Sequence, residues 1–351
     1  MEYRKLGKSG LEVSVVSYGD MRAEDNEENQ KKTNEIINKC FEVGINYFDT
    51  AETYGKGQHE RLLGRALQQC GKKREDYVVS TKIFFGTNPT DPNGRGLSRK
   101  HIMEGLDESL KRLQLDYVDI VFCHRHDPET PVEEFVLAFA QIIKVGKAFY
   151  WATSEWTPEQ IIEAKMVADR FGVPGPIAEQ NQYHMLHRKM HEKQYTYLFD
   201  KIGYGTTVWS PICGGLLSNR FLENPSAKGT RFESPLLAKF QYYNDYFGGE
   251  NATEGQKKWA QLLEVAKELG ADNISILAYA WCIRNKDVST VIAGLSKLQY
   301  VDDVVNALAM SKKFTKEIEE KIDAILGNRP ETDRDWKTQK PVPPRRLSQY
   351  Q

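Results

Sequence analysis

Four polar side chains stand at or just beyond the ends of apolar stretches in this sequence. They are Asp49 and Tyr54 in INYFDTAETYG, Lys82 in YVVSTK and His124 in YVDIVFCH. Each stretch indicates a short buried strand that ends at a reactive group. A tyrosine beside a lysine and a carboxylate can donate a proton, and a histidine can orient a carbonyl group. Together these residue types suit the reduction of an aldehyde or a ketone.

Reduction of a carbonyl group needs a hydride at carbon and a proton at oxygen. The hydride must come from a cofactor, because no side chain supplies one. A free tyrosine has a pKa near ~10, and we expect the ammonium group of Lys82 to lower that of Tyr54 toward the working range. We expect Asp49 to keep Lys82 charged and oriented. We expect His124 to donate a hydrogen bond to the substrate oxygen as negative charge develops there.

Each of the four residues has a simpler explanation when it is taken alone. Asp49 can be the N-cap of the next helix, and Tyr54 can be a loop aromatic. Lys82 can be a solvated charge at a strand end. His124 can be a packed core histidine, or it can form a weak metal pair with His126. Only their combination, at the ends of the second, third and fourth strands, favours a reactive site.

A barrel of parallel strands would bring these groups together, because all its strand ends of one sense open onto one face. Eight apolar segments are predicted as strands: 13–18, 46–49, 77–81, 118–123, 148–153, 177–180, 206–209 and 290–293. Amphipathic patterns predict helices between them: 30–43, 60–69, 100–112, 132–145, 158–171, 189–201, 253–269 and 274–284. Strands joined by such helices pair in parallel with right-handed crossovers.

Eight strand–helix units favour a closed (β/α)8 TIM barrel in the α/β class. An open doubly wound sheet is the alternative, but no GxGxxG follows the first strand. The turn GKSG between 3–6 and 11–13 predicts an N-terminal hairpin. Residues 214–252 predict an extended loop after the seventh strand. We expect one barrel domain over 1–330, and a proline- and charge-rich C-terminal tail over 331–351 that lies on the surface or is disordered.

Composition excludes several classes of function. The 351 residues carry 48 basic and 49 acidic side chains, so no net field favours nucleic acid or an anionic membrane. The five cysteines are scattered and form no CxxC, which indicates a reducing compartment and no disulfide framework. No secretory signal and no long apolar run occurs, so we expect a cytoplasmic protein without direct membrane insertion. The histidines at 184, 187 and 191 lack HExxH, and we expect no metal.

Longer segments resemble the aldo-keto reductases. Within that superfamily the chain is similar to the β subunits of voltage-gated potassium channels and their plant relatives. The similar segments run from about 3 to 330 and include YRKLGKSGLEVS, GINYFDTAETYG, STKIFFG, RGLSRKHIMEGLDESLKRLQLDYVDIVF, HDPETPVEE, YWATSEW, EQNQYHML, TVWSPICGGLLS, AYAWCIRN and DAILGNRP. The resemblance implies a (β/α)8 barrel that binds NADPH at the carboxyl ends of its strands. It also implies that Tyr54 is the acid, supported by Asp49 and Lys82, with His124 at the position of an asparagine in animal channel subunits.

The resemblance further implies contacts with the cofactor. Asp49 would lie beside it, Ser154 and Gln180 would hydrogen-bond the nicotinamide carboxamide, and Trp209 would pack on the nicotinamide ring. The segment after that tryptophan would wrap the pyrophosphate through Ser210, Pro211, Ile212 and Gly214. Glu155 follows YWATS where the animal subunits carry arginine.

The remaining implied contacts concern the phosphates and the adenine. Arg220 would contact a phosphate, and Gly294, Ser296 and Lys297 would meet the 2′-phosphate. Tyr300 and Asp303 stand where the family favours glutamine and glutamate, and Asp303 can accept the adenine amine. These departures put the preference for NADPH over NADH in question.

Two functions follow from these patterns. The first is a cytoplasmic, NADPH-dependent reductase of small aldehydes or ketones, which the presence of His124 favours. The alternative is a homotetrameric accessory subunit on the cytoplasmic domain of a membrane channel, in which the bound cofactor reports redox state and turnover is weak. Cys123 and Cys213 stand near the proposed site, and packing is favoured over a redox role for both.

Overall fold

The computed structural model describes residues 1–21, 24–88, 90–233 and 241–350. The chain divides into two compact units, and each is described by itself. Unit 1 consists of Met1–Asn181, Leu198–Trp209 and Ser289–Val301, and unit 2 consists of Gln182–Tyr197, Ser210–Val288 and Asp302–Gln351. That residues 1–330 act as one domain stays a prediction.

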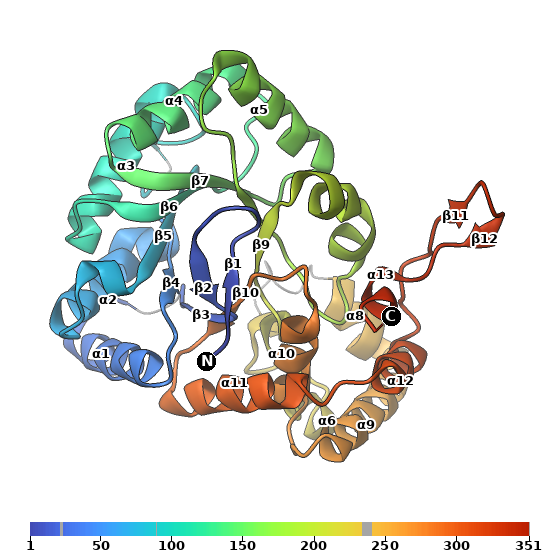
Figure 1. Ribbon diagram of the computed structural model, residues 1–351. Coiled ribbons are helices and arrows are strands. Elements are labelled where there is room, and N and C mark those ends of the chain that lie inside the picture. The colour runs from blue at the N-terminus through green and yellow to red at the C-terminus, as the bar shows by residue number, and fades with distance from the viewer. Residues whose placement is uncertain (22–23, 89, 234–240, 351) are drawn as a thin grey trace. The chain divides into compact units, whose positions relative to one another are not determined.

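Within the described residues, a closed barrel of eight parallel strands lies at the centre of unit 1 (Figure 1). In chain order the strands are β3 (Val16–Gly19), β4 (Tyr47–Asp49), β5 (Val78–Ile83), β6 (Val118–Cys123), β7 (Ala148–Ser154), β8 (Ala178–Gln180), β9 (Gly205–Val208) and β10 (Thr290–Gly294). Each strand pairs with the next barrel strand along the chain, and β10 pairs with both β9 and β3 to close the barrel. The predicted TIM barrel is confirmed.

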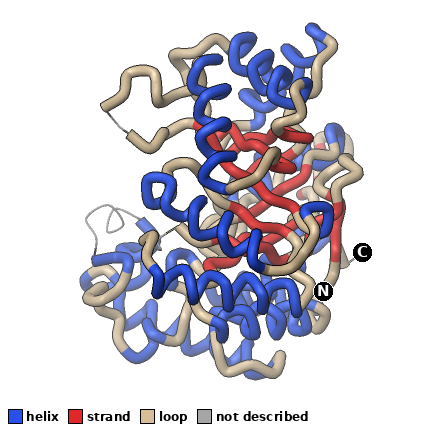
Figure 2. Tube along the Cα trace, turned by 90° about the vertical axis from the view of Figure 1, so that its left-hand side faces the viewer, coloured by secondary structure: helices blue, strands red, loops and turns tan. Residues whose placement is uncertain are grey.

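Helices cover the outside of this barrel, as Figures 1 and 2 show. They are α1 (Glu27–Glu42), α2 (Gln58–Gln69), α3 (Arg99–Leu113), α4 (Val132–Lys144) and α5 (Pro158–Phe171). The predicted starts of two helices are confirmed. The Ser98 hydroxyl accepts a hydrogen bond from the backbone N–H of His101, and Thr157 caps α5 with Pro158 at the first helical position.

The N-terminal hairpin closes one end of the barrel. It pairs β1 (Tyr3–Lys5) with β2 (Glu12–Ser14). Leu6 and Val13 are fully buried in one cluster with residues that begin barrel strands, such as Val78 and Ala178. The hairpin therefore fills the amino-terminal end and leaves the carboxyl ends for other groups.

The prediction of one strand over 13–18 is wrong, because the chain breaks between β2 and β3. The hydroxyl of Ser14 donates to the carbonyl of Val16 at 2.6 Å, and the Ser14 N–H donates to the side chain of Asn46 at 2.7 Å. These local bonds bend the chain from the hairpin into the barrel.

Unit 2 is mostly helical. Its helices are α6 (Arg220–Glu223), α8 (Gln241–Phe247), α9 (Ala252–Glu268), α10 (Ile274–Arg284), α12 (Lys316–Leu326) and α13 (Arg345–Ser348), and α11 (Leu298–Ser311) begins in unit 1. Helix α9 packs against α6, α8, α10 and α12. A small hairpin joins β11 (Arg334–Asp335) to β12 (Lys340–Pro341). Part of the loop predicted over 214–252, residues 234–240, lies outside the described residues. Across the described chain, every helix is too short or too polar to cross a lipid bilayer.

Single turns occur throughout the chain. They are η1 (Tyr54–Gly57), η2 (Arg74–Asp76), η3 (Met190–Gln194), η4 (Leu198–Ile202), η5 (Cys213–Gly215), η6 (Arg231–Glu233) and η7 (Gly249–Asn251). The segment 189–201 is helical as predicted, but it is not one continuous α-helix, because it forms the two π-helical turns η3 and η4. The N–H of Tyr195 bonds the carbonyl of Met190 five residues back, so the ladder of an α-helix is not continued.

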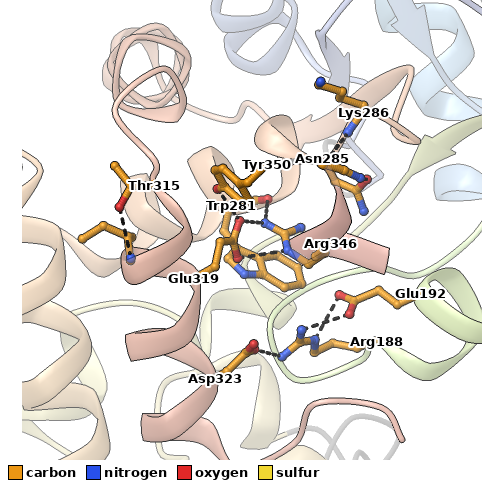
Figure 3. A network of polar contacts seen from close by, with 12 residues as sticks. Arg188, Glu192, Trp281, Asn285, Lys286, Thr315, Glu319, Asp323, Arg346 and Tyr350 are labelled. Atoms are coloured by element: carbon orange, nitrogen blue, oxygen red, sulfur yellow. Dashed lines mark hydrogen bonds and ion pairs between the residues drawn. The ribbon is translucent and has the colours of Figure 1, made fainter. Parts of the chain in front are cut away.

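The C-terminal segment is anchored inside unit 2 by a buried arginine (Figure 3). The Nε and Nη2 atoms of Arg346 donate to the Glu319 carboxylate at 3.0 and 2.6 Å, and Nη1 donates to the hydroxyl of Tyr183 at 2.9 Å. Its Cζ atom lies over the Trp281 ring, 3.8 Å from the ring centroid. Arg346 is only 3% exposed, so this part of the tail, expected on the surface or disordered, is held in the interior.

Candidate active site

Asp49 and Lys82 form a buried ion pair at the carboxyl ends of β4 and β5. Their carboxylate and ammonium groups are in direct contact, and Lys82 also donates to the carbonyl of Thr50 at 2.7 Å. Lys82 is 0% exposed. Burial lowers the pKa of Lys82, but the negative charge of Asp49 and the interaction with Tyr54 outweigh burial and raise it overall. The lysine is therefore held in its charged form.

A layer of polar groups spans the barrel interior at this level. The Oδ1 atom of Asp49 accepts hydrogen bonds from the hydroxyl of Ser80 at 2.6 Å and from the side-chain amide of Gln180 at 3.1 Å. The same amide donates to the hydroxyl of Thr207 at 3.2 Å. Because Gln180 ends β8 and Asp49 ends β4, this bond crosses the interior and fixes both side chains.

Tyr54 stands on the turn that follows β4. The turn η1 contains Gly55, Lys56 and Gly57 with φ of +56°, +55° and +84°. A side chain at position 57 would come within 2.6 Å of the Cδ atom of Arg112, so glycine is required there. The ammonium group of Lys82 lies 4.9 Å from the centroid of the Tyr54 ring. Tyr54 is half-buried, whereas Lys82 is fully buried.

His124 lies beside the tyrosine at the end of β6. Its ring meets the Tyr54 ring edge-on, with centroids 6.0 Å apart, and the Phe85 ring with centroids 5.0 Å apart. Burial lowers the pKa of His124 well below its usual value, and the charges of Lys82 and Arg125 lower it further. The imidazole is therefore neutral at physiological pH. Its Nδ1 atom is buried without a hydrogen-bond partner among the described residues, which suits a polar ligand.

The structure brings further groups to this site that the sequence analysis missed. His59 lies between the hydroxyls of Thr50, at 2.9 Å, and Tyr18, at 3.4 Å. Burial lowers the pKa of His59 to about 4, so it too is neutral. The motif DTAETYG contained Thr50 as a signal, but nothing in the sequence linked it to His59 nine residues later.

Glu52 holds the loop that follows β5. Its Oε1 atom accepts from the backbone N–H groups of Phe84 and Gly86, both at 2.7 Å. Its Oε2 atom lies 3.2 Å from Nε2 of His101. Burial lowers the pKa of His101, but the hydrogen bond and charge of Glu52 outweigh burial and raise it. By holding the residues on either side of Phe85, this carboxylate fixes the Phe85 ring, which packs against His124.

The residues predicted to hold the nicotinamide lie at the ends of β7 and β8 and just after β9. Ser154 and Gln180 are register partners, and the Ser154 hydroxyl donates to the Gln180 carbonyl at 3.0 Å. Trp209 follows β9 and is half-buried. Its indole N–H donates to the carboxylate of Glu155 at 2.8 Å.

A buried glutamate supports the turn after β7. The Glu179 carboxylate accepts from the hydroxyl of Thr153 at 2.6 Å and from the backbone N–H of Trp156 at 3.1 Å. Burial raises the pKa of Glu179 to about 8. The turn between these two contacts carries Ser154 and Glu155, so Glu179 positions both.

The residues predicted near the 2′-phosphate lie at the end of β10 and just beyond it. Gly294 pairs with Gly19 and has open space where a side chain would stand. Ser296 and Lys297 are exposed before α11 begins, and the ammonium of Lys297 lies 5.7 Å from the Tyr300 ring. Exposed hydroxyl and ammonium donors at a helix start suit a phosphate group, so these residues fit the dinucleotide that the resemblance implies.

The other predicted cofactor contacts belong to unit 2: Ser210, Pro211, Ile212, Gly214, Arg220 and Asp303. The backbone at Ser210 and Gly214 is left-handed, with φ of +59° and +64°, and the N–H of Gly214 donates to the Ser210 hydroxyl at 3.2 Å. Arg220 is exposed and donates to the carbonyl of Lys228. The roles of these six residues remain predictions.

Two cysteines near the predicted site are buried. Burial raises the pKa of the Cys123 thiol and of the Cys213 thiol, so neither forms a thiolate readily. This agrees with a packing role. Within the described ranges, no group of three or more His, Cys, Asp or Glu side chains is arranged to hold a metal ion.

Comparisons with known proteins identify the family. The Aldo/keto reductase family matches residues 15–326. A protein of Oryza sativa subsp. japonica named "Probable voltage-gated potassium channel subunit beta" is 40% identical over 330 residues, which are 94% of this chain and 98% of that protein. The protein of the same name from Arabidopsis thaliana is 38% identical over 330 residues, with the same coverage of both chains. A "Putative voltage-gated potassium channel subunit beta" of Schizosaccharomyces pombe is 41% identical over 332 residues, which are 93% of this chain and 94% of that protein. The chain belongs to the aldo/keto reductase family.

Proposed function

We propose that this protein is an NADPH-dependent reductase of small aldehydes or ketones. One observation carries the proposal: a fully buried, charged Lys82 lies against the ring of Tyr54, and a neutral His124 meets that ring from another side. Family membership supports an oxidoreductase, and the chemistry of these side chains supports carbonyl reduction.

NADPH, when bound, supplies the hydride to the carbonyl carbon. Ser154, Gln180 and Trp209 would hold its nicotinamide end. Ser296 and Lys297, with Gly294, would receive its 2′-phosphate.

Tyr54 gives its hydroxyl proton to the carbonyl oxygen. The phenolate that remains is stabilised by the ammonium group of Lys82 at the ring. Asp49 keeps that ammonium charged and in place, since its carboxylate is itself fixed by Ser80 and Gln180. The fixed charges are set before the reaction, so little reorganisation accompanies proton transfer.

His124 orients the substrate. A neutral imidazole donates one N–H hydrogen bond to the carbonyl oxygen and does not compete with Tyr54 as an acid. Burial beside two cations keeps the ring neutral, which suits this role.

The test uses the purified chain with NADPH and 4-nitrobenzaldehyde. We expect the cofactor absorbance to fall with wild-type protein. Tyr54→Phe should lower kcat by about 10²–10⁴-fold, the usual contribution of a positioned general acid, while NADPH still binds. Tyr117→Phe, which removes a hydroxyl outside the site, is the matched control and should react as wild type. Equal rates for Tyr54→Phe and wild type would overturn the proposal.

The names of the relatives favour a second function, that of a β subunit associated with a voltage-gated potassium channel. In this case we infer that four chains associate and bind the cytoplasmic domain of a potassium channel. Light scattering during size-exclusion chromatography would show a tetramer, and a pull-down with such a domain would show binding. A monomer that binds no channel domain would exclude this function and leave the reductase standing.

A further inference from the structure

We propose that Arg125 anchors an anionic group of the substrate, so that carbonyl compounds bearing a carboxylate are favoured. This inference rests on the reductase proposed above. It adds a substrate class, because it assigns a recognition site beside the reacting groups.

Arg125 directly follows His124, and only part of its hydrogen-bonding capacity is used. Its Nη1 atom donates to the His124 carbonyl at 2.5 Å and to the Ser154 hydroxyl at 3.3 Å. A guanidinium has five N–H groups in a planar fork. In the described part of the chain, the Nε and Nη2 atoms have no hydrogen-bond partner, and no carboxylate forms an ion pair with Arg125.

The position of the guanidinium is close to the reacting end of the site. Its Cζ atom lies 5.8 Å from the centroid of the Phe85 ring, and the His124 ring lies 5.0 Å from the same centroid. The arginine also contacts Ser154, which is predicted to hold the nicotinamide. Lys297 and Ser296, the predicted 2′-phosphate contacts, follow a different strand. A substrate anion is therefore the better match for Arg125 than a cofactor phosphate.

The charge balance around His124 points the same way. Lys82 and Arg125 are the two charged groups that affect this histidine, and both are cations. Asp49 neutralises Lys82. The acidic groups on the neighbouring segments are engaged elsewhere. Asp127 accepts from the Leu97 N–H at 2.8 Å, Glu155 accepts from the indole N–H of Trp209 at 2.8 Å, and the buried Glu179 accepts from the Thr153 hydroxyl at 2.6 Å.

An uncompensated positive charge remains at Arg125, which is half-buried. A carboxylate can occupy the free edge of the guanidinium through two parallel hydrogen bonds. A substrate with such a group on a short spacer would reach the arginine while its carbonyl oxygen lies at Tyr54 and His124.

The test compares two substrates that share one ring, 4-carboxybenzaldehyde and 4-nitrobenzaldehyde, with 3-carboxybenzaldehyde to vary the spacer. Arg125→Met should lower kcat/KM for at least one carboxylate substrate by about 10–100-fold relative to the nitro substrate, as expected for a lost charge-assisted hydrogen bond. Arg125→Lys should recover part of this ratio, because it restores charge without the fork. Arg170→Met, at an exposed ion pair on α5, should leave the ratio unchanged.

A fall in kcat/KM of equal size for all substrates would overturn the proposal. Arg125 would then only position His124 and Ser154. Failure of the holoenzyme to reduce any of the aldehydes would instead count against the reductase itself. In that case calorimetric titration of the NADP⁺-loaded protein with benzoate and with benzamide decides the anion site. Benzoate binding that Arg125→Met abolishes supports the site, and equal or undetectable benzoate binding in both proteins overturns it.

Discussion

The indole N–H of Trp209 donates a 2.8 Å hydrogen bond to the carboxylate of Glu155, whose own backbone is left-handed with φ of +58°. A non-glycine residue in this conformation is uncommon, and the surrounding contacts must hold it there. The Trp156 N–H, which donates to buried Glu179, supplies one such contact. The orientation of the ring is therefore linked to the turn that carries Ser154.

Glu155→Ala should weaken NADPH binding, because the Trp209 ring loses the bond that orients it. The expected loss is about 0.5–1.5 kcal/mol, a 2–10-fold rise in Kd. Quenching of protein fluorescence by NADPH measures this constant. Glu155→Gln keeps an acceptor oxygen and should bind nearly as wild type. Unchanged affinity in the alanine variant would contradict the role of this bond.

Lys82→Met should destabilise the fold as well as abolish reduction. It leaves Asp49 buried without its cation, which costs about 3–5 kcal/mol for a broken buried pair. The double variant Asp49→Asn/Lys82→Met removes both charges and should regain most of that stability without regaining activity. Urea unfolding and an NADPH assay separate the two effects. Equal stability of the single and double variants would argue against a tight pair.

Glu179 should make stability fall with pH. Its pKa is about 8 in the fold and near 4.5 when unfolded, so the folded state binds more protons between these values. Over that window its contribution falls by about 1.4 kcal/mol per pH unit and is constant outside it. Glu179→Gln should lack this slope. The unfolding free energies of wild type and Glu179→Gln are measured from pH 5 to 8.5, and their difference gives the contribution of Glu179. A difference that does not change with pH would refute the raised pKa of Glu179.

The Glu52–His101 pair should act in the same sense as Glu179 and support the fold at low pH. Because the pKa of His101 is raised above 6.5, its stabilising contribution is full below about pH 6.5 and is lost as the pH rises through the folded value. His101→Gln should therefore cost more stability at pH 5.5 than at pH 8.5. Unfolding curves at both values test this, and an equal cost at both would show that the pair does not titrate.

Arg346→Met should destabilise unit 2 strongly. The variant leaves Glu319 buried without its bidentate partner, and loss of one member of such a pair costs about 3–5 kcal/mol. Arg345→Met, which changes the preceding arginine in the same way, is the matched control. Its pair with Asp287 is partly exposed, so we expect about 1 kcal/mol or less. Urea unfolding compares the two, and equal losses would mean that burial of the Arg346 pair is not decisive.

Much of the fold could be predicted from the sequence, because it depends on local patterns. The alternation of apolar and amphipathic segments predicted all eight barrel strands, although the first was predicted to begin too early, at residue 13. Strand ends also indicated which side chains would meet: Asp49 contacts Lys82, and Tyr54 lies beside both Lys82 and His124. The chemical roles of these four remain predictions.

Features that depend on distant partners could not be predicted. Glu52 meets His101 across 49 residues, and no spacing rule links them. Arg346 stands in a segment rich in proline and charge, which by composition suggests an exposed tail. Its burial depends on Glu319 and on Tyr183, which is 163 residues away in the chain. A binding role for Arg125 could not be predicted either, because it depends on which of its N–H donors the fold leaves without a partner.

The ring of strands has a consequence for how this protein is made. Strand β10 supplies the pairing for both β3 and β9, yet it follows β9 only after the long segment 210–288. During synthesis on the ribosome, the edges of β3 and β9 therefore stay unpaired until Gly294 has emerged. Unpaired strand edges are templates for aggregation. Nascent chains that stop before residue 290 should be the forms that need chaperones most.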